Sequence, residues 1–433
     1  MNNIRVRLAL MNFLEFAAWG AYLTSMGRYL GNIGVGTEIG YFYSMQGIAS
    51  LFMPALMGIV ADRWIPAQRL LGLCHLLAGS FMFMAAWYGT TAAATGVAFS
   101  TLFSLYACSV AFYMPTLALS YSVAYSALRK AGMDTIKDFP PIRVFGTVGF
   151  ILTMWTVDIM GLQATQWQFA VSGGVSILLF AYSFTLPECP VARSAGKKSI
   201  GEAMGLKAFA LFKDKQMALF FLFSMMLGVN LQITNGYANP YISSFAADPL
   251  FADTFGVEHA NILISLSQIS ETCCILLIPF FMKRLGIKGV MLIAMFAWVA
   301  RFGLFATGDP GEGVWMLLLS MIVYGVAFDF FNISGSLYVD QNTSADIRSS
   351  AQGLFTLVTN GIGATVGMVG AQKVINHFTY SEQVGENIYT LGDWQTCWTL
   401  FAVYALVVGI LFALAFHPKS GVEKVKKGGE RDI

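Results

Sequence analysis

The feature that most constrains the fold is a succession of long apolar runs along the 433-residue chain. A helix needs about 20 mainly apolar residues to cross the ~30 Å hydrocarbon core of a bilayer. Twelve runs satisfy this requirement: 9–30, 39–61, 69–88, 97–122, 143–161, 167–186, 216–239, 259–282, 288–307, 314–338, 349–373 and 395–416. The pattern predicts an all-α integral membrane protein with twelve transmembrane helices.

The loops between these runs alternate in charge. The odd-numbered loops contain no Lys or Arg, whereas the even-numbered loops and both chain ends contain most of the basic residues. We name the two sides of the protein the even-loop face, which carries both ends, and the odd-loop face, formed by loops 31–38, 89–96, 162–166, 240–258, 308–313 and 374–394. Basic loops collect on the cytoplasmic side of a membrane. We therefore expect both termini in the cytoplasm.

The longest even-numbered loop divides the chain into two parts. It reads "PECPVARSAGKKSIGEAMGLKAFALFKDKQ" and is rich in Lys, Gly and Ala. A transporter built from two related bundles, with its site between them at mid-membrane, has this organisation. We predict an N-terminal six-helix bundle at 1–186, a cytoplasmic linker at 187–215, a C-terminal six-helix bundle at 216–416 and a cytoplasmic tail at 417–433.

Several classes of function find no support in the sequence. Five of the six cysteines fall within apolar runs, and the four histidines lack the spacing of metal ligands. No nucleophile with a base and no phosphate-binding loop is recognisable. We therefore expect no enzyme, no cofactor or metal, and no nucleic-acid partner.

Polar groups inside the apolar runs carry most of the functional information, because they are costly in a bilayer. In "NLQITNGYANP", Gln232, Asn235 and Asn239 have the spacing of one helical face. They predict a polar lining, or alternatively hydrogen bonds that join helices. Asn239, directly before Pro240, has the simpler alternative of ending its helix.

Two acids lie within runs of the C-terminal half. In "SLSQISET", Gln268 and Glu271 share a helical face. Burial favours the protonated form of a carboxyl group, so Glu271 could exchange a proton, or it could be held in a structural pair. Asp329 is the only charged residue between positions 315 and 338, where a charge costs at least ~2.5–3.5 kcal/mol. The position of Asp329 therefore indicates that its carboxyl group has a functional role.

The aromatic residues near Asp329 indicate a class of ligand. Tyr324 and Phe328 are one turn apart, and Asp329 is rotated by roughly 100° from Phe328, so the acid and the rings need not face the same cavity. An aromatic face can stack on a base for ~1–3 kcal/mol, and amides offer donors and acceptors to its edge. A nucleoside fits this set, but a sugar or polyol fits as well.

The N-terminal half contributes a further stripe in "FPPIRVFGTVGF", where Arg143, Thr147 and Phe150 share a face. Arg143 is near enough to the predicted membrane edge to extend toward it. Facing inward, it could instead pair with a carboxylate or donate to a polar ligand. Glu15 and Arg301 are two further charges within runs; we expect Arg301 to pair with another buried charge, and the role of Glu15 stays open.

The loop between the second and third runs contains the pattern G-x-x-x-D-R in "GIVADRW". It resembles a signature of the major facilitator superfamily in this loop. The basic cluster that usually follows is thinned to Arg69, and an ordinary tight turn is the alternative interpretation.

Longer stretches carry a more specific resemblance: "FMPALMGIVADRW", "AGMDTIKDFPPIRVFGTVGF", "LQITN", "SQISE", "SMIVYGVAFDFFNISGS" and "DWQTCW". Along essentially its whole length the chain resembles the bacterial nucleoside/proton symporters of the major facilitator superfamily, a group of nucleoside and xanthosine permeases. The resemblance implies two six-helix bundles and a ligand site formed by Arg143, Thr147, Phe150, Gln232, Asn235, Gln268, Glu271, Tyr324 and Phe328. It also implies that Glu271 and Asp329 take part in proton coupling. Glu15 departs from the resemblance, which implies an amide at that position.

The leading hypothesis is therefore proton-coupled nucleoside uptake across the bacterial inner membrane by alternating access. The expected partners are a nucleoside, protons and the lipid bilayer, and the expected state is a monomer. A proton-coupled carrier of sugars or oligosaccharides is one alternative. A membrane sensor that binds without translocating is another, although no soluble signalling domain follows the twelfth run.

Overall fold

The computed structural model describes residues 2–189, 206–343 and 348–417. Parts of the predicted linker (190–205) and of the predicted tail (418–433) lie outside these ranges. So do the side chains of Asp62 and Arg63 in the loop pattern between the second and third runs. Within the described ranges, nine helices are long and apolar enough to cross a membrane.

The N-terminal half has helices in all six of its predicted spans. Its elements are α1 (Asn2–Gly20), α2 (Met26–Asn32), η1 (Gly36–Glu38), α3 (Ile39–Arg63), α4 (Ala67–Thr91), α5 (Phe99–Lys130), α6 (Thr135–Ile159) and α7 (Trp167–Ser183). The first span is interrupted by a turn between α1 and α2. Helix α6 begins two turns before the predicted span, so that Pro140 and Pro141 lie within it.

The C-terminal half supplies the other six spans. Its helices are η2 (Leu206–Lys213), α9 (Lys215–Leu231), α10 (Ile233–Ser244), η3 (Phe245–Ala247), α11 (Phe255–Glu258), α12 (Ala260–Thr307), α13 (Val314–Gln341), α14 (Arg348–Thr356), the π-helical η4 (Leu357–Gly363), α15 (Ala364–Phe378) and α16 (Trp394–Ala415). Helix α12 contains two predicted spans, joined where Gly286 adopts φ 66°. The twelve-helix prediction is therefore confirmed, with three spans broken or distorted.

A two-stranded hairpin was not predicted. Strands β1 (Thr379–Val384) and β2 (Asn387–Gly392) pair antiparallel in the last odd-numbered loop. The two-residue connection requires a positive φ, which Gly385 supplies at 64°. The hairpin covers the odd-loop face.

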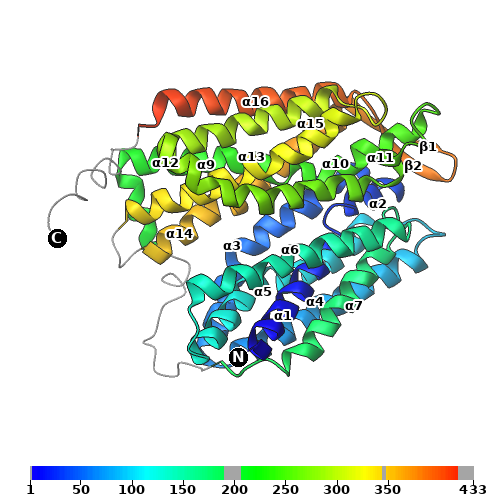
Figure 1. Ribbon diagram of the computed structural model, residues 1–433. Helices are drawn as coiled ribbons and strands as arrows, with labels where there is room; N and C mark the ends of the chain where they lie inside the picture. Colours follow the sequence, from blue (N-terminus) through cyan, green and yellow to red (C-terminus); the bar gives the residue numbers. More distant parts are fainter. Residues whose placement is uncertain (1, 190–205, 344–347, 418–433) are drawn as a thin grey trace.

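The two halves converge at one face and separate toward the other. Figure 1 shows α2, α10 and the hairpin together at one end of the molecule, while α14 and the N-terminus lie apart at the opposite end. Small residues allow the close approach between α2 and α10: a Cβ on Gly27 would lie 2.2 Å from the carbonyl oxygen of Gly236. At Gly58, near the even-loop face, a Cβ would meet no described atom within 4 Å. Among the described residues, no neighbouring helix therefore approaches Gly58 closely in this conformation.

Candidate functional site

Helices α6 and α12 pack against one another across the boundary between the halves and run antiparallel. Near the odd-loop face, Trp155 Nε1 donates to Ser265 Oγ at 2.8 Å. Asp158 Oδ2 accepts from the backbone N–H groups of Asn261 (2.9 Å) and Ile262 (3.1 Å), and its Oδ1 lies 2.5 Å from His259 Nδ1. A carboxylate at a helix N-terminus is favoured by the unpaired N–H groups and by the helix dipole. Asp158 of one half therefore caps α12 of the other.

Asn239 belongs to this junction and does not end its helix. Its amide nitrogen lies 2.9 Å from Gln163 Oε1 and 2.9 Å from Asn261 Oδ1. Thr24 donates to the same Asn261 oxygen at 3.0 Å. Helix α10 continues through Pro240 to Ser244. The interpretation of Asn239 as a helix terminator is wrong, and the alternative of an interhelical bond holds.

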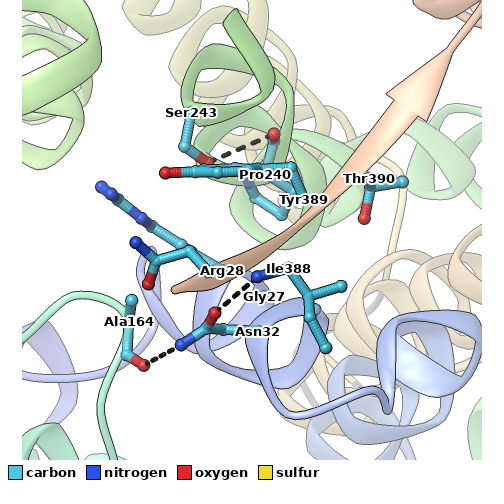
Figure 2. A pocket seen from close by; sticks show the side chains of 11 residues that line it. Gly27, Arg28, Asn32, Ala164, Pro240, Ser243, Ile388, Tyr389 and Thr390 are labelled. Carbon is cyan, nitrogen blue, oxygen red and sulfur yellow. Dashed lines mark hydrogen bonds between the residues drawn. The ribbon is translucent and has the colours of Figure 1, made fainter. Parts of the chain in front are cut away.

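The halves are also closed where α2 meets the hairpin (Figure 2). Asn32 donates to the carbonyl of Ala164 at 3.2 Å and accepts from the backbone N–H of Ile388 at 2.9 Å. The cavity beside Arg28 and Tyr389 has a volume of about 10 Å³. A space of this size holds one water molecule at most. No nucleoside-sized passage crosses this part of the described odd-loop face.

Along α6, the predicted stripe lies against α1 and α5 of its own half and reaches the other half at Arg143. The Arg143 guanidinium lies 3.8 Å from the centre of the Phe16 ring, and its Nε donates to Tyr121 at 3.0 Å. Arg143 also interacts electrostatically with Glu271. It therefore points inward and does not extend toward the membrane edge. Phe150 is buried further along the same helix, and Thr147 between them is half-buried.

The predicted amides of the C-terminal half lie on two elements. Gln232 occupies the break between α9 and α10, and the Asn235 amide donates to Gln232 Oε1 at 2.9 Å. Gln268 lies one turn before Glu271 on α12. All three amides are half-buried. Broken helices of this kind are typical of transporter sites, where freed backbone groups and side chains face a pathway.

The two acids and Tyr324 form one electrostatic cluster. Glu271 interacts with Asp329, and Tyr324 interacts with both carboxylates. Asp329 is only 5% exposed, and its Oδ2 is buried without a hydrogen-bond partner among the described residues. With Arg143, this cluster extends across both halves at mid-helix.

Tyr324 is also the centre of an aromatic stack. Its ring lies 5.5 Å from that of Phe328 at an interplanar angle of 17°, and the Arg301 guanidinium lies 4.5 Å from its centre. Arg301 donates to the carbonyl of Ser320 at 2.7 Å and to the hydroxyl of Thr234 at 3.1 Å. Within the described chain no carboxylate lies within 4 Å of Arg301, so the prediction that it pairs with another charge is wrong.

Sequence reasoning missed the partner of Glu15. The carboxylate is fully buried and its Oε2 lies 2.8 Å from Nε2 of the equally buried His75. The one signal in the sequence was a histidine within an apolar run, and spacing along the chain does not connect it to Glu15, which lies 60 positions away.

Comparison with known proteins identifies the family of this architecture. The family described as "Nucleoside H+ symporter" matches residues 1–421. The chain is 46% identical to the xanthosine permease of Escherichia coli K12 over 427 residues, 98% of each protein. It is also 46% identical to the nucleoside permease NupG of the same organism over 420 residues, 96% of this chain and 97% of the permease.

Solved structures agree with this match. The crystal structure of the nucleoside transporter NupG superposes with a TM-score of 0.85 at 44% identity, covering 96% of this chain and 100% of that one. A D-xylose–proton symporter superposes with a TM-score of 0.68 at 12% identity, over 96% and 98% of the two chains, and this likeness concerns the fold alone. The chain belongs to the nucleoside H+ symporter family and has the fold of the major facilitator superfamily.

Proposed function

We propose that this protein carries nucleosides together with protons across the bacterial inner membrane by alternating access. The observation that carries the proposal is the cluster of Arg143, Glu271, Asp329 and Tyr324, which joins buried acids, a cation and an aromatic stack across both halves. The names of the relatives, a nucleoside permease and a xanthosine permease, support a nucleoside as the ligand.

The ligand would take up the polar and aromatic groups between the halves. The stacked rings of Tyr324 and Phe328 present a flat surface for the base, which such contacts stabilise by ~1–3 kcal/mol. Amides can match donors and acceptors on the base edge or the ribose. The full proposed set is Arg143, Thr147, Phe150, Gln232, Asn235, Gln268, Glu271, Tyr324 and Phe328.

Protons would act at Glu271 and Asp329. Two carboxylates that interact in a buried site take up and release protons as a unit. Glu271 also attracts Arg143 of the opposite half. A proton on Glu271 removes that attraction, so protonation changes the contact between the halves at the site itself. Proton binding can therefore bias the conformational equilibrium, as coupling requires.

The predicted orientation in the membrane determines which side of the membrane the closed junction faces. With the even-loop face in the cytoplasm, the junction at Asp158 and Asn239 closes the route to the outside. The two bodies that move against each other would be 1–186 and 216–416. The ligand shifts their equilibrium only by its different affinity for the two arrangements.

Uptake of uridine and adenosine into proteoliposomes, with and without an inward proton gradient, tests the proposal. We expect gradient-driven accumulation that excess nucleoside, but not excess sugar, suppresses. Saturable uptake without accumulation would make the protein a facilitator. No nucleoside uptake, together with sugar uptake, would favour the sugar carrier instead.

A further inference from the structure

The N-terminal half contains a buried titratable cluster outside the proposed ligand site. Glu15 of α1 and His75 of α4 are both 0% exposed, with Glu15 Oε2 2.8 Å from His75 Nε2. Thr116 of α5 donates its hydroxyl to Glu15 Oε1 at 2.6 Å. The Tyr113 hydroxyl donates to the backbone carbonyl of Glu15 at 2.8 Å, and its ring packs edge-on against His75. Both oxygens of a buried carboxylate are thus occupied.

The net charge of this cluster depends on the protonation of Glu15 and His75. The titratable groups of the described residues that interact with Glu15 are Cys74 of α4 and Tyr113 of α5. Thiols and phenols are neutral at physiological pH. The helices around the pair also carry charged groups nearer their ends, Arg5 and Arg7 (α1), Arg69 (α4), Arg129 and Lys130 (α5), and Asp138 and Asp158 (α6). The Arg143 guanidinium lies over Phe16, the residue after Glu15. The proton count of Glu15 and His75 therefore sets the net charge beneath Arg143.

Two protonation states of the pair differ by a single proton. A neutral imidazole that donates its Nε2 proton to an ionised Glu15 leaves the pair with a charge of −1. One further proton makes it neutral overall, as an imidazolium–carboxylate pair or as a carboxylic acid beside an imidazole. A buried site of low polarity favours the state without net charge. The pair is therefore suited to take up one proton.

The second ring nitrogen links this proton to conformation. His75 Nδ1 is buried without a hydrogen-bond partner among the described residues. When the added proton lies on the imidazole or on Glu15 Oε2, Nδ1 carries a hydrogen, which here would be a buried donor without an acceptor among the described residues and hence unfavourable. In the unloaded state Nδ1 has only a lone pair to satisfy. A proton on Glu15 Oε1 would instead be donated to Thr116, whose own hydroxyl hydrogen can go to the Tyr113 carbonyl at 2.6 Å. A conformation loaded at the imidazole must therefore supply an acceptor for Nδ1.

A short chain of contacts connects the cluster to the proposed ligand site. The Tyr113 ring lies 6.0 Å from that of Trp19, and Trp19 lies 6.2 Å from Phe150, nearly perpendicular to it. These ring contacts join the helices of the pair to α6, which carries Arg143. The Arg143 guanidinium itself lies 3.8 Å from the ring of Phe16, the residue after Glu15.

We infer that Glu15 and His75 form a second proton-binding site, in the N-terminal half, which loads and releases one proton in each transport cycle. The inference rests on the proposed nucleoside/proton symport and adds to it a proton that does not pass through Glu271 and Asp329. The transporter then moves at least two protons with each nucleoside.

The test is the proton-to-uridine ratio, measured for the full chain in proteoliposomes from the membrane potential and pH gradient at which net uridine flux reverses. We expect a ratio of at least two for the parent and a ratio lower by one for Glu15→Gln and for His75→Gln. With a gradient of one pH unit, each lost proton lowers uridine accumulation ~tenfold. Asp138→Asn, an acid paired with Arg5 on the even-loop side of α6, is the matched control and should keep the parent ratio.

Glu15→Asp retains an acid in the pair and should also keep the parent ratio, which separates loss of the proton from loss of packing. A parent ratio of one, or an unchanged ratio in both Glu15→Gln and His75→Gln, overturns the inference while leaving symport intact. Uridine flux in the parent that does not depend on the proton gradient would contradict the proposed function instead. If Glu15→Gln does not insert, His75→Gln and the parent ratio decide.

Discussion

The two halves of the molecule differ in how completely their buried charged residues are hydrogen-bonded. In the N-terminal half, Glu15 and Asp158 have partners at both carboxylate oxygens. In the C-terminal half, considering the residues that the structure describes, Asp329 has one buried oxygen without a partner, and Arg301 has an unpaired Nε and only neutral groups hydrogen-bonded to its other nitrogens. A buried polar group without a partner costs about 1–3 kcal/mol. The C-terminal half therefore retains charges that its own structure does not satisfy.

The difference indicates where the ligand and the proton of Asp329 act; in the N-terminal half, the corresponding unsatisfied atom among the described residues is Nδ1 of His75. A charge whose partners are all built into the fold stabilises one arrangement, whereas an unsatisfied charge gains when a proton or ligand arrives. On this view, changes at Asp329 should affect coupling most, changes around the aromatic stack should affect binding, and changes at Asp158 should affect the balance between conformations.

The largest effect is expected for Asp329→Asn. The amide preserves shape but holds no exchangeable proton, so the share of uphill accumulation driven by the Asp329 proton should disappear while nucleoside exchange continues. Under a gradient of two pH units, each coupled proton supports ~100-fold accumulation, so this variant should accumulate ~100-fold less uridine than the parent. Uptake and counterflow of uridine in the same vesicles measure both properties. Uphill transport at the parent level would show that the unsatisfied oxygen has no role in coupling.

The aromatic stack comes next. Phe328→Ala removes the ring that stacks on Tyr324 and should weaken nucleoside binding by roughly tenfold or more, the equivalent of ~1–3 kcal/mol. Phe328→Tyr keeps the ring and is the matched control. Calorimetric titration of the purified protein with uridine gives both affinities. Equal affinities for the two variants would show that the base does not bind to this surface.

Arg301→Lys should have a smaller effect on the same binding. The guanidinium reaches Ser320, Thr234 and the face of Tyr324 at once, whereas an ammonium group cannot reproduce this planar fork. Loss of the support under Tyr324 should weaken uridine binding about fivefold, in line with a cation–π contact of ~1 kcal/mol. An unchanged affinity with a lower thermal midpoint would make Arg301 purely structural.

The smallest effect is expected for Asp158→Asn, which removes the charge at the N-terminus of α12. Because such a charge contributes about 0.3–1 kcal/mol, the equilibrium should shift two- to fivefold toward the arrangement open at the odd-loop face. Spin labels on loops 162–166 and 240–258 would report longer distances. The substitution Asp138→Asn on the same helix should leave them unchanged, and a shift in that control would point to a general loss of α6 stability.

Much of the fold followed from the sequence because the bilayer dictates it. Apolar runs of membrane length could be located without knowledge of their neighbours, and the twelve spans were confirmed. The interruptions could not be located, because they depend on tertiary contacts: Gln232 breaks a span that reads as continuous, and Gly286 joins two spans within one helix.

The candidate site was predictable only in part, for the same reason. Side chains on one helical face follow from spacing, so the stripe at Arg143 and the stack at Tyr324 could be proposed. Partners across the chain do not follow from spacing. The bond between Asn239 and Gln163, the cap by Asp158 and the pair of Glu15 with His75 each join residues at least 60 positions apart. The ligand-binding role of the predicted residues stays a prediction.

The most direct test of the central claim uses uridine as the driving force in place of protons, since coupling must operate in both directions. Proteoliposomes without a pH gradient, clamped at zero membrane potential and containing a pH indicator, would receive external uridine. The proposed symport predicts acidification of the lumen that saturates with uridine and that falls by about one proton per uridine in Asp329→Asn. Uridine entry without any change in luminal pH would contradict it.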